Sequence, residues 1–142
     1  AGDPHIIDKS YNYESFSKML AFDVNPGFIS SSQDLTNSFL SKNSGASIRL
    51  TKTNSACVSS LLLETRYKGL FGQKGINALD MESSIVFSAA KDIEAEAACL
   101  MYVSDHIDTN PLEKNTEEKT KRKIFFARKK LAEMITDFTD EQ

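Results

Sequence analysis

The sequence predicts an α/β fold in which helices cover both faces of a β-sheet. Strand and helix patterns alternate along residues 76–138, and this order is typical of α/β sheets. The apolar run at residues 97–103 lacks polar alternation, as expected of a strand that is covered on both faces. The chain has 142 residues, of which 40% are hydrophobic. This is the size of one domain with a real hydrophobic core.

The first 45 residues predict a surface segment followed by a helix. Residues 1–30 are polar and contain Pro4, Pro26 and Gly27 as breakers, so we expect them to cross the surface without regular structure. Three serines at residues 30–32 then precede apolar residues at helical spacing. This pattern predicts a helix of about ten residues that has a serine N-cap and ends near Asn43.

Residues 46–93 predict two strands and two helices. Alternating apolar and polar side chains at residues 46–51 are typical of a half-buried strand. A short helix at residues 61–67 is expected to stop at Gly69. Residues 76–79 predict a short buried strand, which turns directly into a helix with apolar residues at helical spacing. These apolar residues are Ile85, Val86, Ala89, Ala90 and Ile93.

The carboxyl-terminal part predicts a strand at residues 97–103, a loop and a long amphipathic helix. Asn115 or Thr116 is suited to cap this helix. Its apolar stripe consists of Ile124, Phe125, Leu131, Ile135 and Phe138. Residues 113–130 hold eight Lys or Arg and three Glu. We interpret them as a solvated face rather than a nucleic-acid site, because no aromatic stacking platform accompanies them.

Composition and charge exclude several classes of function. With 17 Lys+Arg against 20 Asp+Glu, the net charge of −3 is not that of a strongly basic nucleic-acid binder. The longest apolar run has seven residues, whereas a membrane-spanning helix needs about 20. Cys57 and Cys99 are isolated thiols without a CxxC motif. We therefore expect a cytoplasmic protein without structural metal, and with neither nucleic acid nor a membrane as its partner.

Two polar clusters follow the ends of predicted strands: Asp80-Met81-Glu82 and Ser104-Asp105-His106. In an open α/β sheet, ligands bind outside the carboxyl ends of the strands. The N-terminus of the next helix favours an ionised Glu82, which can accept hydrogen bonds from sugar hydroxyls. Burial behind an apolar strand favours a protonated Asp105. One acceptor and one donor suit the acid-assisted cleavage of a base from a sugar.

Each of these residues also has an interpretation without a functional role. Asp80, three positions before Ser83, is suited to cap the helix. Met81 alone would pack into the core, and Ser104-Asp105 would form an ordinary turn. His106 has no second ligand at metal-binding spacing. Neither cysteine has an evident base partner that would make it a nucleophile.

Residues 77–90 and 98–109 together resemble the carboxyl-terminal half of the purine nucleoside phosphorylase and uridine phosphorylase family. The Asp80-Met-Glu-Ser strand-to-helix turn and the Val103-Ser-Asp strand end carry this resemblance. The run that starts at Ser104 is most similar to the hexameric bacterial type of purine nucleoside phosphorylase. The resemblance implies a mixed β-sheet flanked by helices on both faces. It also implies that residues 1–142 form a single α/β domain, the carboxyl-terminal half of a longer one.

The resemblance implies a role for four residues of the two clusters. In the family, the glutamate that matches Glu82 holds the ribose hydroxyls, and the methionine that matches Met81 packs against the sugar. The aspartate that matches Asp105 donates a proton to the purine ring, and Ser104 helps to position it. Residues 48–54 resemble the strand that lines the base pocket, although they lack the family's stacking aromatic residue. Asp105 favours a purine substrate, because uridine-specific members lack this acid.

The function implied by the resemblance is that of a purine nucleoside phosphorylase, which transfers ribose or deoxyribose from a purine to phosphate. Inorganic phosphate would be the co-substrate, and no cofactor is implied. Two alternatives stay open: a nucleosidase that uses water in place of phosphate, and a truncated relative that binds nucleosides without turnover. The discriminating feature is a set of phosphate-binding arginines in the family's amino-terminal half. The family also implies a homo-oligomer.

Overall fold

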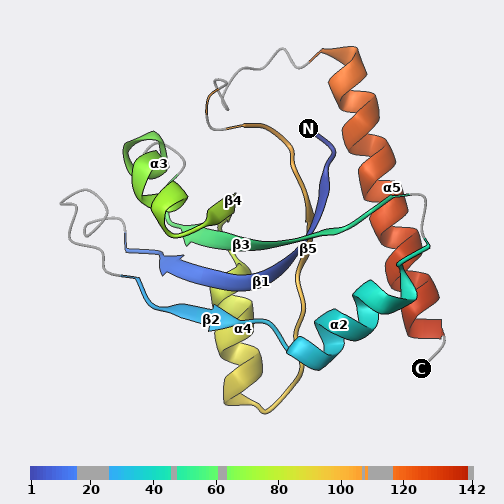
Figure 1. Ribbon diagram of the computed structural model, residues 1–142, viewed down its shortest axis with the longest axis horizontal. Helices are drawn as coiled ribbons and strands as arrows, with labels where there is room; N and C mark the ends of the chain where they lie inside the picture. The colour runs from blue at the N-terminus through green and yellow to red at the C-terminus, as the bar shows by residue number, and fades with distance from the viewer. Residues whose placement is uncertain (16–25, 46–47, 61–63, 107, 109–116, 141–142) are drawn as a thin grey trace.

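The computed structural model describes residues 1–15, 26–45, 48–60, 64–106, 108 and 117–140. Within these residues, five strands form one mixed sheet (Figure 1): β1 (Pro4–Tyr13), β2 (Phe28–Ser30), β3 (Thr51–Val58), β4 (Ile76–Asp80) and β5 (Leu100–Tyr102). Strand β1 is central. It runs parallel to β3 on one side, and β3 runs parallel to β4. On its other side, β1 pairs antiparallel with β5 along its first residues and with β2 further on.

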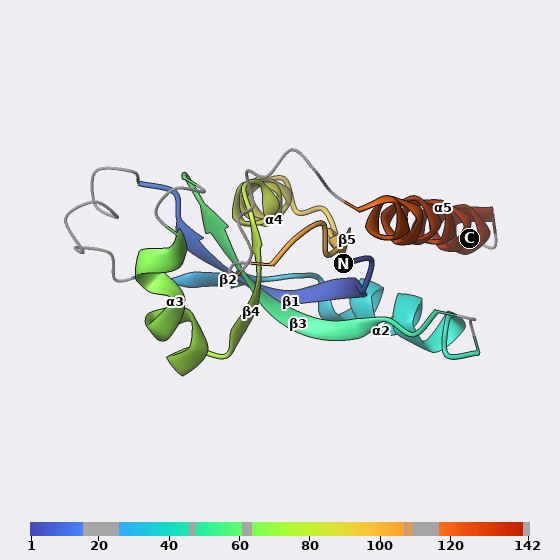
Figure 2. The same ribbon diagram turned by 90° about the horizontal axis from the view of Figure 1, so that it is seen from above.

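The described helices are α2 (Gln33–Lys42), α3 (Glu64–Gln73), α4 (Ser83–Asp92) and α5 (Glu118–Asp140). Helices α3 and α4 lie on opposite sides of the sheet, and α5 stands at one end of it (Figure 2). This arrangement confirms the predicted α/β fold, a mixed sheet with flanking helices. No helix among the described residues has the length and apolar character that crossing a membrane requires.

Two apolar clusters hold the layers together. One joins the sheet to α3 through Tyr13, Ala56, Val58, Tyr67, Phe71 and Ile76. The other joins β1 to α2 and α5 through Ile6, Phe39, Leu50, Leu131, Met134 and Phe138. The second cluster explains why the long helix α5 docks by its carboxyl-terminal half, where Leu131, Met134 and Phe138 are buried.

Strand β1 is the largest departure from the sequence prediction. Residues 1–30 were expected to lack regular structure, yet Pro4–Tyr13 forms the central strand, and Phe28–Ser30 forms its neighbour. Ile6 and Ile7 are adjacent and both fully buried, because β1 is covered on both faces. Ser10 is buried as well, with its hydroxyl in a hydrogen bond. Neither an alternating pattern nor an apolar run therefore marks this strand in the sequence.

The helix predicted after the three serines is confirmed as α2, of ten residues, with Ser32 at its N-cap position. The Ser32 side chain does not cap this helix. Its Oγ instead accepts a hydrogen bond from the backbone N–H of Ala97, at 2.7 Å. The serine thus ties the start of α2 to the segment before β5, and its capping role was predicted wrongly.

Two predicted boundaries in the middle of the chain were wrong. The strand expected at residues 46–51 begins only at Thr51 and continues to Val58; residues 46–47 lie outside the described part of the chain. The helix expected at residues 61–67 begins at Glu64 among the described residues and passes Gly69 to end at Gln73. Glycine weakens a helix by only about 1 kcal/mol, and the buried Tyr67 and Phe71 hold α3 on the sheet across it.

The predicted strand-to-helix transition is confirmed by β4 and α4. The strand expected at residues 97–103 is wrong in length and burial, because only Leu100–Tyr102 is strand and all three residues are half-buried. The last helix is confirmed by α5, although Phe125 and Ile135 of its predicted stripe are exposed. The predicted caps Asn115 and Thr116 lie outside the described residues.

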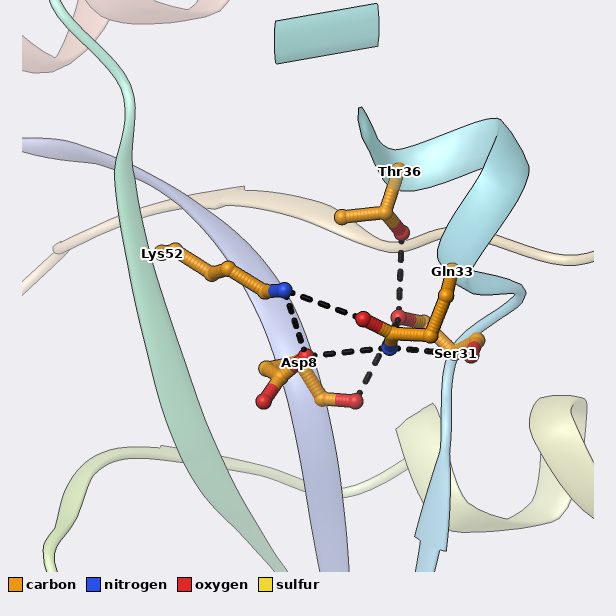
Figure 3. Close-up of polar contacts among 5 residues, drawn as sticks. All are labelled: Asp8, Ser31, Gln33, Thr36 and Lys52. Carbon is orange, nitrogen blue, oxygen red and sulfur yellow. Dashed lines mark hydrogen bonds and ion pairs between the residues drawn. The ribbon is translucent and has the colours of Figure 1, made fainter. Parts of the chain in front are cut away.

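A polar cluster fastens α2 to the middle of the sheet (Figure 3). The Lys52 ammonium lies 2.9 Å from Asp8 Oδ1 and donates to Gln33 Oε1 at 3.0 Å. Gln33 Nε2 in turn donates to Asp8 Oδ1 at 3.0 Å. Burial raises the pKa of Asp8, but the hydrogen bonds from Lys52 and Gln33 lower it more, and the net shift is downward. The cluster is internally paired, so we interpret it as a structural link between β1, β3 and α2.

Candidate active site

The turn between β4 and α4 is built on Asp80. Its Oδ1 accepts hydrogen bonds from the backbone N–H groups of Glu82 at 2.9 Å and Ser83 at 2.7 Å. Its Oδ2 accepts a third, from Ser83 Oγ at 2.6 Å. These bonds satisfy free N–H groups at the start of the helix. Asp80 was predicted as the N-cap residue, but Glu82 occupies the N-cap position of α4. The Asp80 carboxylate instead bonds the turn before the helix and fixes the backbone on either side of Met81.

Met81 and Glu82 both point away from the core at this turn. Met81 is 42% exposed, so the alternative that it is a core residue is wrong. Glu82 is exposed, and its carboxylate accepts a hydrogen bond from the backbone N–H of Met81 at 3.2 Å. Its carboxylate lies at the N-terminus of α4, where the helix dipole attracts negative charge. The two side chains are thus accessible to a ligand, and their predicted roles stay predictions.

Ser83 anchors the turn to the sheet. Its hydroxyl lies 2.7 Å from Ser10 Oγ of β1 and 3.1 Å from Ser55 Oγ of β3. All three serines are buried. A buried hydroxyl must find partners, since an unpaired one costs about 1–3 kcal/mol. The serine cluster therefore selects one position of α4 on the sheet, and with it the position of Glu82.

Ser104 and Asp105 follow β5 and are both exposed, so the burial expected for Asp105 was wrong. The carboxyl ends of β5 and β4 lie near opposite ends of β1. Strand β5 runs antiparallel to β1 and places Tyr102 beside Pro4. Asp80 instead pairs with Cys57, which pairs with Asn12 near the other end of β1. Among the described contacts, none joins Asp105 to Glu82 directly.

The segment after β5 lies against the first part of α3. Lys68 of α3 forms an ion pair with Asp108, and the backbone N–H of Asp108 donates to His106 Nδ1 at 3.3 Å. The same part of α3 contains Glu64, which is only 6% exposed. Burial raises the pKa of Glu64 to about 7, and the charge of Asp105 adds to this shift.

Sequence reasoning did not identify Glu64. An acidic residue in the first turn of a helix is usually a solvated partner of the helix dipole, and nothing in the sequence distinguishes this one. Its only local signal is the apolar run that precedes it at residues 61–63. Its burial is a property of the folded chain that helix periodicity does not predict.

The two cysteines are not nucleophiles in this site. Burial raises the pKa of each thiol to about 11. Cys57 is fully buried, and its Sγ donates to Glu14 Oε1 at 3.3 Å. Both thiols therefore stay protonated at neutral pH. In the part of the chain that the structure describes, no three His, Cys, Asp or Glu side chains are grouped to hold a metal ion.

The fold is similar to that of several solved nucleosidases. The structure of Campylobacter jejuni 5′-methylthioadenosine/S-adenosyl homocysteine nucleosidase superposes with a TM-score of 0.76 at 17% sequence identity. The match covers 99% of this chain and 62% of that chain. Helicobacter pylori futalosine hydrolase superposes with a TM-score of 0.70 at 17% identity, covering 99% and 61%.

A third solved structure is also similar in fold at low sequence identity. The Helicobacter pylori 5′-methylthioadenosine/S-adenosylhomocysteine nucleosidase has a TM-score of 0.72 at 17% identity, and the match covers 99% of this chain and 61% of that chain. The chain thus spans about three fifths of the length of these proteins. No curated protein sequence matches it. The family model described as the Phosphorylase superfamily matches residues 1–139, and the chain therefore belongs to that superfamily.

Proposed function

We propose that the full-length protein cleaves the N-glycosidic bond of a purine nucleoside and transfers the pentosyl group to phosphate. The observation that supports this most is the turn at the start of α4. Asp80 and Ser83 hold it rigidly, and it exposes Glu82 and Met81 in a superfamily of nucleoside-cleaving enzymes. A carboxylate and a thioether side by side suit the polar and apolar sides of a pentose.

In the proposed reaction, the Glu82 carboxylate accepts hydrogen bonds from the ribose hydroxyls, and Met81 packs against the sugar. These contacts position C1′ and stabilise the positive charge that develops on the ring. The electron pair of the bond between C1′ and the base nitrogen moves onto the purine. Asp105 donates a proton to the purine ring, Ser104 helps to position this acid, and a phosphate oxygen bonds to C1′. Because Asp105 does not contact Glu82, the nucleoside must bridge the two clusters.

A second candidate function is hydrolysis of the same bond, with water in place of phosphate. One observation favours it. The similar solved structures described above are named nucleosidases and a hydrolase. A nucleoside-binding relative without turnover is the third outcome that the experiment below distinguishes.

The test is an assay of the natural full-length protein with inosine, adenosine and 5′-methylthioadenosine, each with and without phosphate. Release of base only when phosphate is present, together with formation of a pentose 1-phosphate, supports phosphorolysis. Release of base and free pentose without phosphate supports hydrolysis. If no nucleoside is cleaved under either condition, the proposal of an enzyme is wrong. Sedimentation analysis of the same protein tests the expected homo-oligomer.

Asp105→Asn tests the acid. A well-placed general acid contributes about 10²–10⁴-fold in rate, so we expect kcat to fall by about that factor while the KM changes little. Asp92→Asn, at the exposed end of α4, is the matched control and is expected to leave both constants unchanged. Equal losses of kcat and of nucleoside affinity in Asp105→Asn would contradict the role of Asp105.

A further inference from the structure

Helix α5 exposes an aromatic ring among positively charged side chains. Phe125 was predicted to lie in the apolar stripe that faces the core, yet it is 72% exposed. The buried residues of α5 are instead Ala127, Leu131, Met134 and Phe138. Figure 2 shows α5 at one end of the molecule, beyond the sheet. Packing within the described chain therefore gives the Phe125 ring no role.

Four cations surround this ring on the surface of the helix. Residues three and four positions apart are neighbours on an α-helix. At these spacings from Phe125 lie the exposed side chains of Lys121, Arg122, Arg128 and Lys129. Residues 117–130 hold seven Lys or Arg and two Glu, whereas the whole chain has a net charge of −3. The positive charge of the chain is thus concentrated on the amino-terminal half of α5.

Carboxylates on the same helix neutralise these four cations only in part. Arg122 Nε lies 3.6 Å from Glu118 Oε1, and Lys129 Nζ lies 3.9 Å from Glu133 Oε1. Exposed ion pairs of this kind contribute little to stability, so phosphate oxygens can replace the glutamates at low cost. Within the described part of the chain, no ion pair involves the other two cations. The group as a whole is therefore suited to bind an anionic ligand.

The ring among the cations favours single-stranded nucleic acid as that ligand. Proteins that bind single strands combine positive charges for the phosphates with aromatic rings on which the bases stack. A helix that lies on a membrane needs a wide apolar side, and the apolar side of α5 is buried in the fold. The sequence favoured a solvated face because no stacking platform was evident. The exposed Phe125 removes that reason.

We propose that the amino-terminal half of α5 binds single-stranded nucleic acid. A base stacks on the Phe125 ring, and the four cations around it bind the neighbouring phosphates. This contact recognises no particular sequence, because neither the ring nor the cations read the edges of the bases. The rest of the chain is acidic, so the contact is confined to this half of the helix. The inference does not depend on the proposed function, since none of these residues belongs to the candidate active site.

The test is the fluorescence anisotropy of a labelled oligothymidylate that is titrated with the natural full-length protein at several salt concentrations. Each phosphate contact with a single strand contributes about −0.7 to the slope of log K against log salt concentration. We therefore expect binding at low salt with a slope of up to about −3 for four contacts. A duplex of the same length is expected to bind more weakly, because its bases are stacked on each other and cannot stack on Phe125.

Variants separate stacking from charge. Phe125→Ala is expected to weaken binding by about tenfold and to leave the salt slope unchanged, whereas Phe125→Tyr keeps a ring and retains binding. Arg128→Gln is expected to reduce the slope by about 0.7. The matched controls are Ile135→Ala, at a position on α5 that is 46% exposed, and Lys91→Gln, at an exposed position on α4. Both controls should bind like the parent, and none of these exposed positions holds the core together.

Several results would overturn the proposal. The parent protein does not bind oligothymidylate at low salt, or Phe125→Ala binds it as well as the parent does. Binding to vesicles of anionic phospholipid without binding to oligothymidylate would assign the surface to a membrane instead. If Arg128→Gln dissociates an oligomer in sedimentation analysis, a second copy of the chain covers this surface, and the proposal is wrong.

A further variant keeps this test separate from that of the proposed function. Glu82→Gln changes the candidate active site and is expected to retain oligothymidylate binding. If Glu82→Gln abolishes that binding, the oligonucleotide occupies the candidate active site, and the proposal for α5 is overturned. If the parent binds oligothymidylate through α5 but cleaves no nucleoside, the proposal for α5 stands, and the proposed function is wrong.

Discussion

The two faces of the sheet are packed by opposite kinds of side chain. On the α3 face, the rings of Tyr13, Tyr67 and Phe71 pack together, with Tyr13 in edge contacts at 5.6 and 5.2 Å between ring centroids. On the α4 face, Ser83 meets the hydroxyls of Ser10 and Ser55. Burial of apolar rings stabilises the α3 face, here called the aromatic face. On the α4 face, here called the serine face, each buried hydroxyl needs a hydrogen-bond partner. The helix that bears the candidate site is thus held by a directional contact in addition to the buried Phe87 ring.

The orientation of α4 follows from this difference. Its apolar side chains recur at helical spacing, and such a stripe normally faces the core. Here Ile85, Val86 and Ile93 are 55%, 50% and 76% exposed, and the sheet-facing side consists of Ser83, Ser84 and Phe87. Periodicity located the helix correctly and did not determine which side of it meets the sheet. Hydroxyl pairing, the buried Phe87 ring and the hydrogen bonds of Asp80 set that orientation.

The largest expected effect comes from the aromatic face. Phe71→Ala removes a ring that is 4% exposed and leaves a cavity between Tyr13 and Tyr67. We expect the free energy of unfolding to fall by about 3–5 kcal/mol, as measured by urea denaturation. Leu70→Ala, next to it on α3 but 40% exposed, is the control and should cost less than half as much. Equal losses would mean that the aromatic cluster does not hold α3 on the sheet.

The next effect depends on pH and concerns the start of the same helix. The pKa of Glu64 in the folded chain is about 7, above its usual value near 4.3, so the native state binds more protons between these two values. The contribution of Glu64 to the free energy of unfolding is fully present below about pH 4 and is lost as the pH rises through 7. Glu64→Gln removes that loss. We expect it to stabilise the fold by about 2–4 kcal/mol at pH 8 and by little at pH 4.

Urea denaturation at pH 4 and pH 8 measures this difference. Glu118→Gln is the control and should show the same small change at both pH values, because its side chain is 69% exposed. A Glu64→Gln effect that is identical at the two pH values would show that Glu64 titrates as an ordinary surface carboxyl. That result would mean that burying Glu64 beside the aromatic cluster does not make the stability of the fold depend on pH.

The serine face is expected to respond less strongly. Ser83→Ala removes the partner of Ser10, Ser55 and the Asp80 carboxylate. Because buried hydroxyls then lose a hydrogen bond, we expect a loss of about 1–3 kcal/mol in the free energy of unfolding. Ser88→Ala, on the exposed side of α4, should leave stability nearly unchanged. A neutral Ser83→Ala would indicate that the hydroxyl cluster does not orient α4.

The smallest effect is expected on the outward side of α4. Ile85→Ser should change the free energy of unfolding by less than about 0.5 kcal/mol, as for most surface positions. Phe87→Ala, on the same helix but 2% exposed, should cost about 3–5 kcal/mol. Denaturation of both variants compares the two sides of one helix directly. A large loss for Ile85→Ser would contradict the orientation of α4.

The sequence by itself determined the features that depend on short-range interactions. Residue spacing predicted α2, the β4–α4 transition and α5, because an α-helix is formed by hydrogen bonds between residues four positions apart. The Asp80-Met81-Glu82 motif and the Ser104-Asp105 motif were sufficient to indicate the superfamily that the match over residues 1–139 then showed.

Only the tertiary structure decided the features that depend on distant partners. Strand β1 is central because β2, β3 and β5 all pair with it, and its own sequence carries no strand pattern. The antiparallel direction of β5 puts its carboxyl end beside Pro4 rather than beside the end of β4, and the fold buries Glu64. Burial, pairing direction and the shift of a pKa are properties of what packs against a residue. They arise only when segments far apart in the sequence come together.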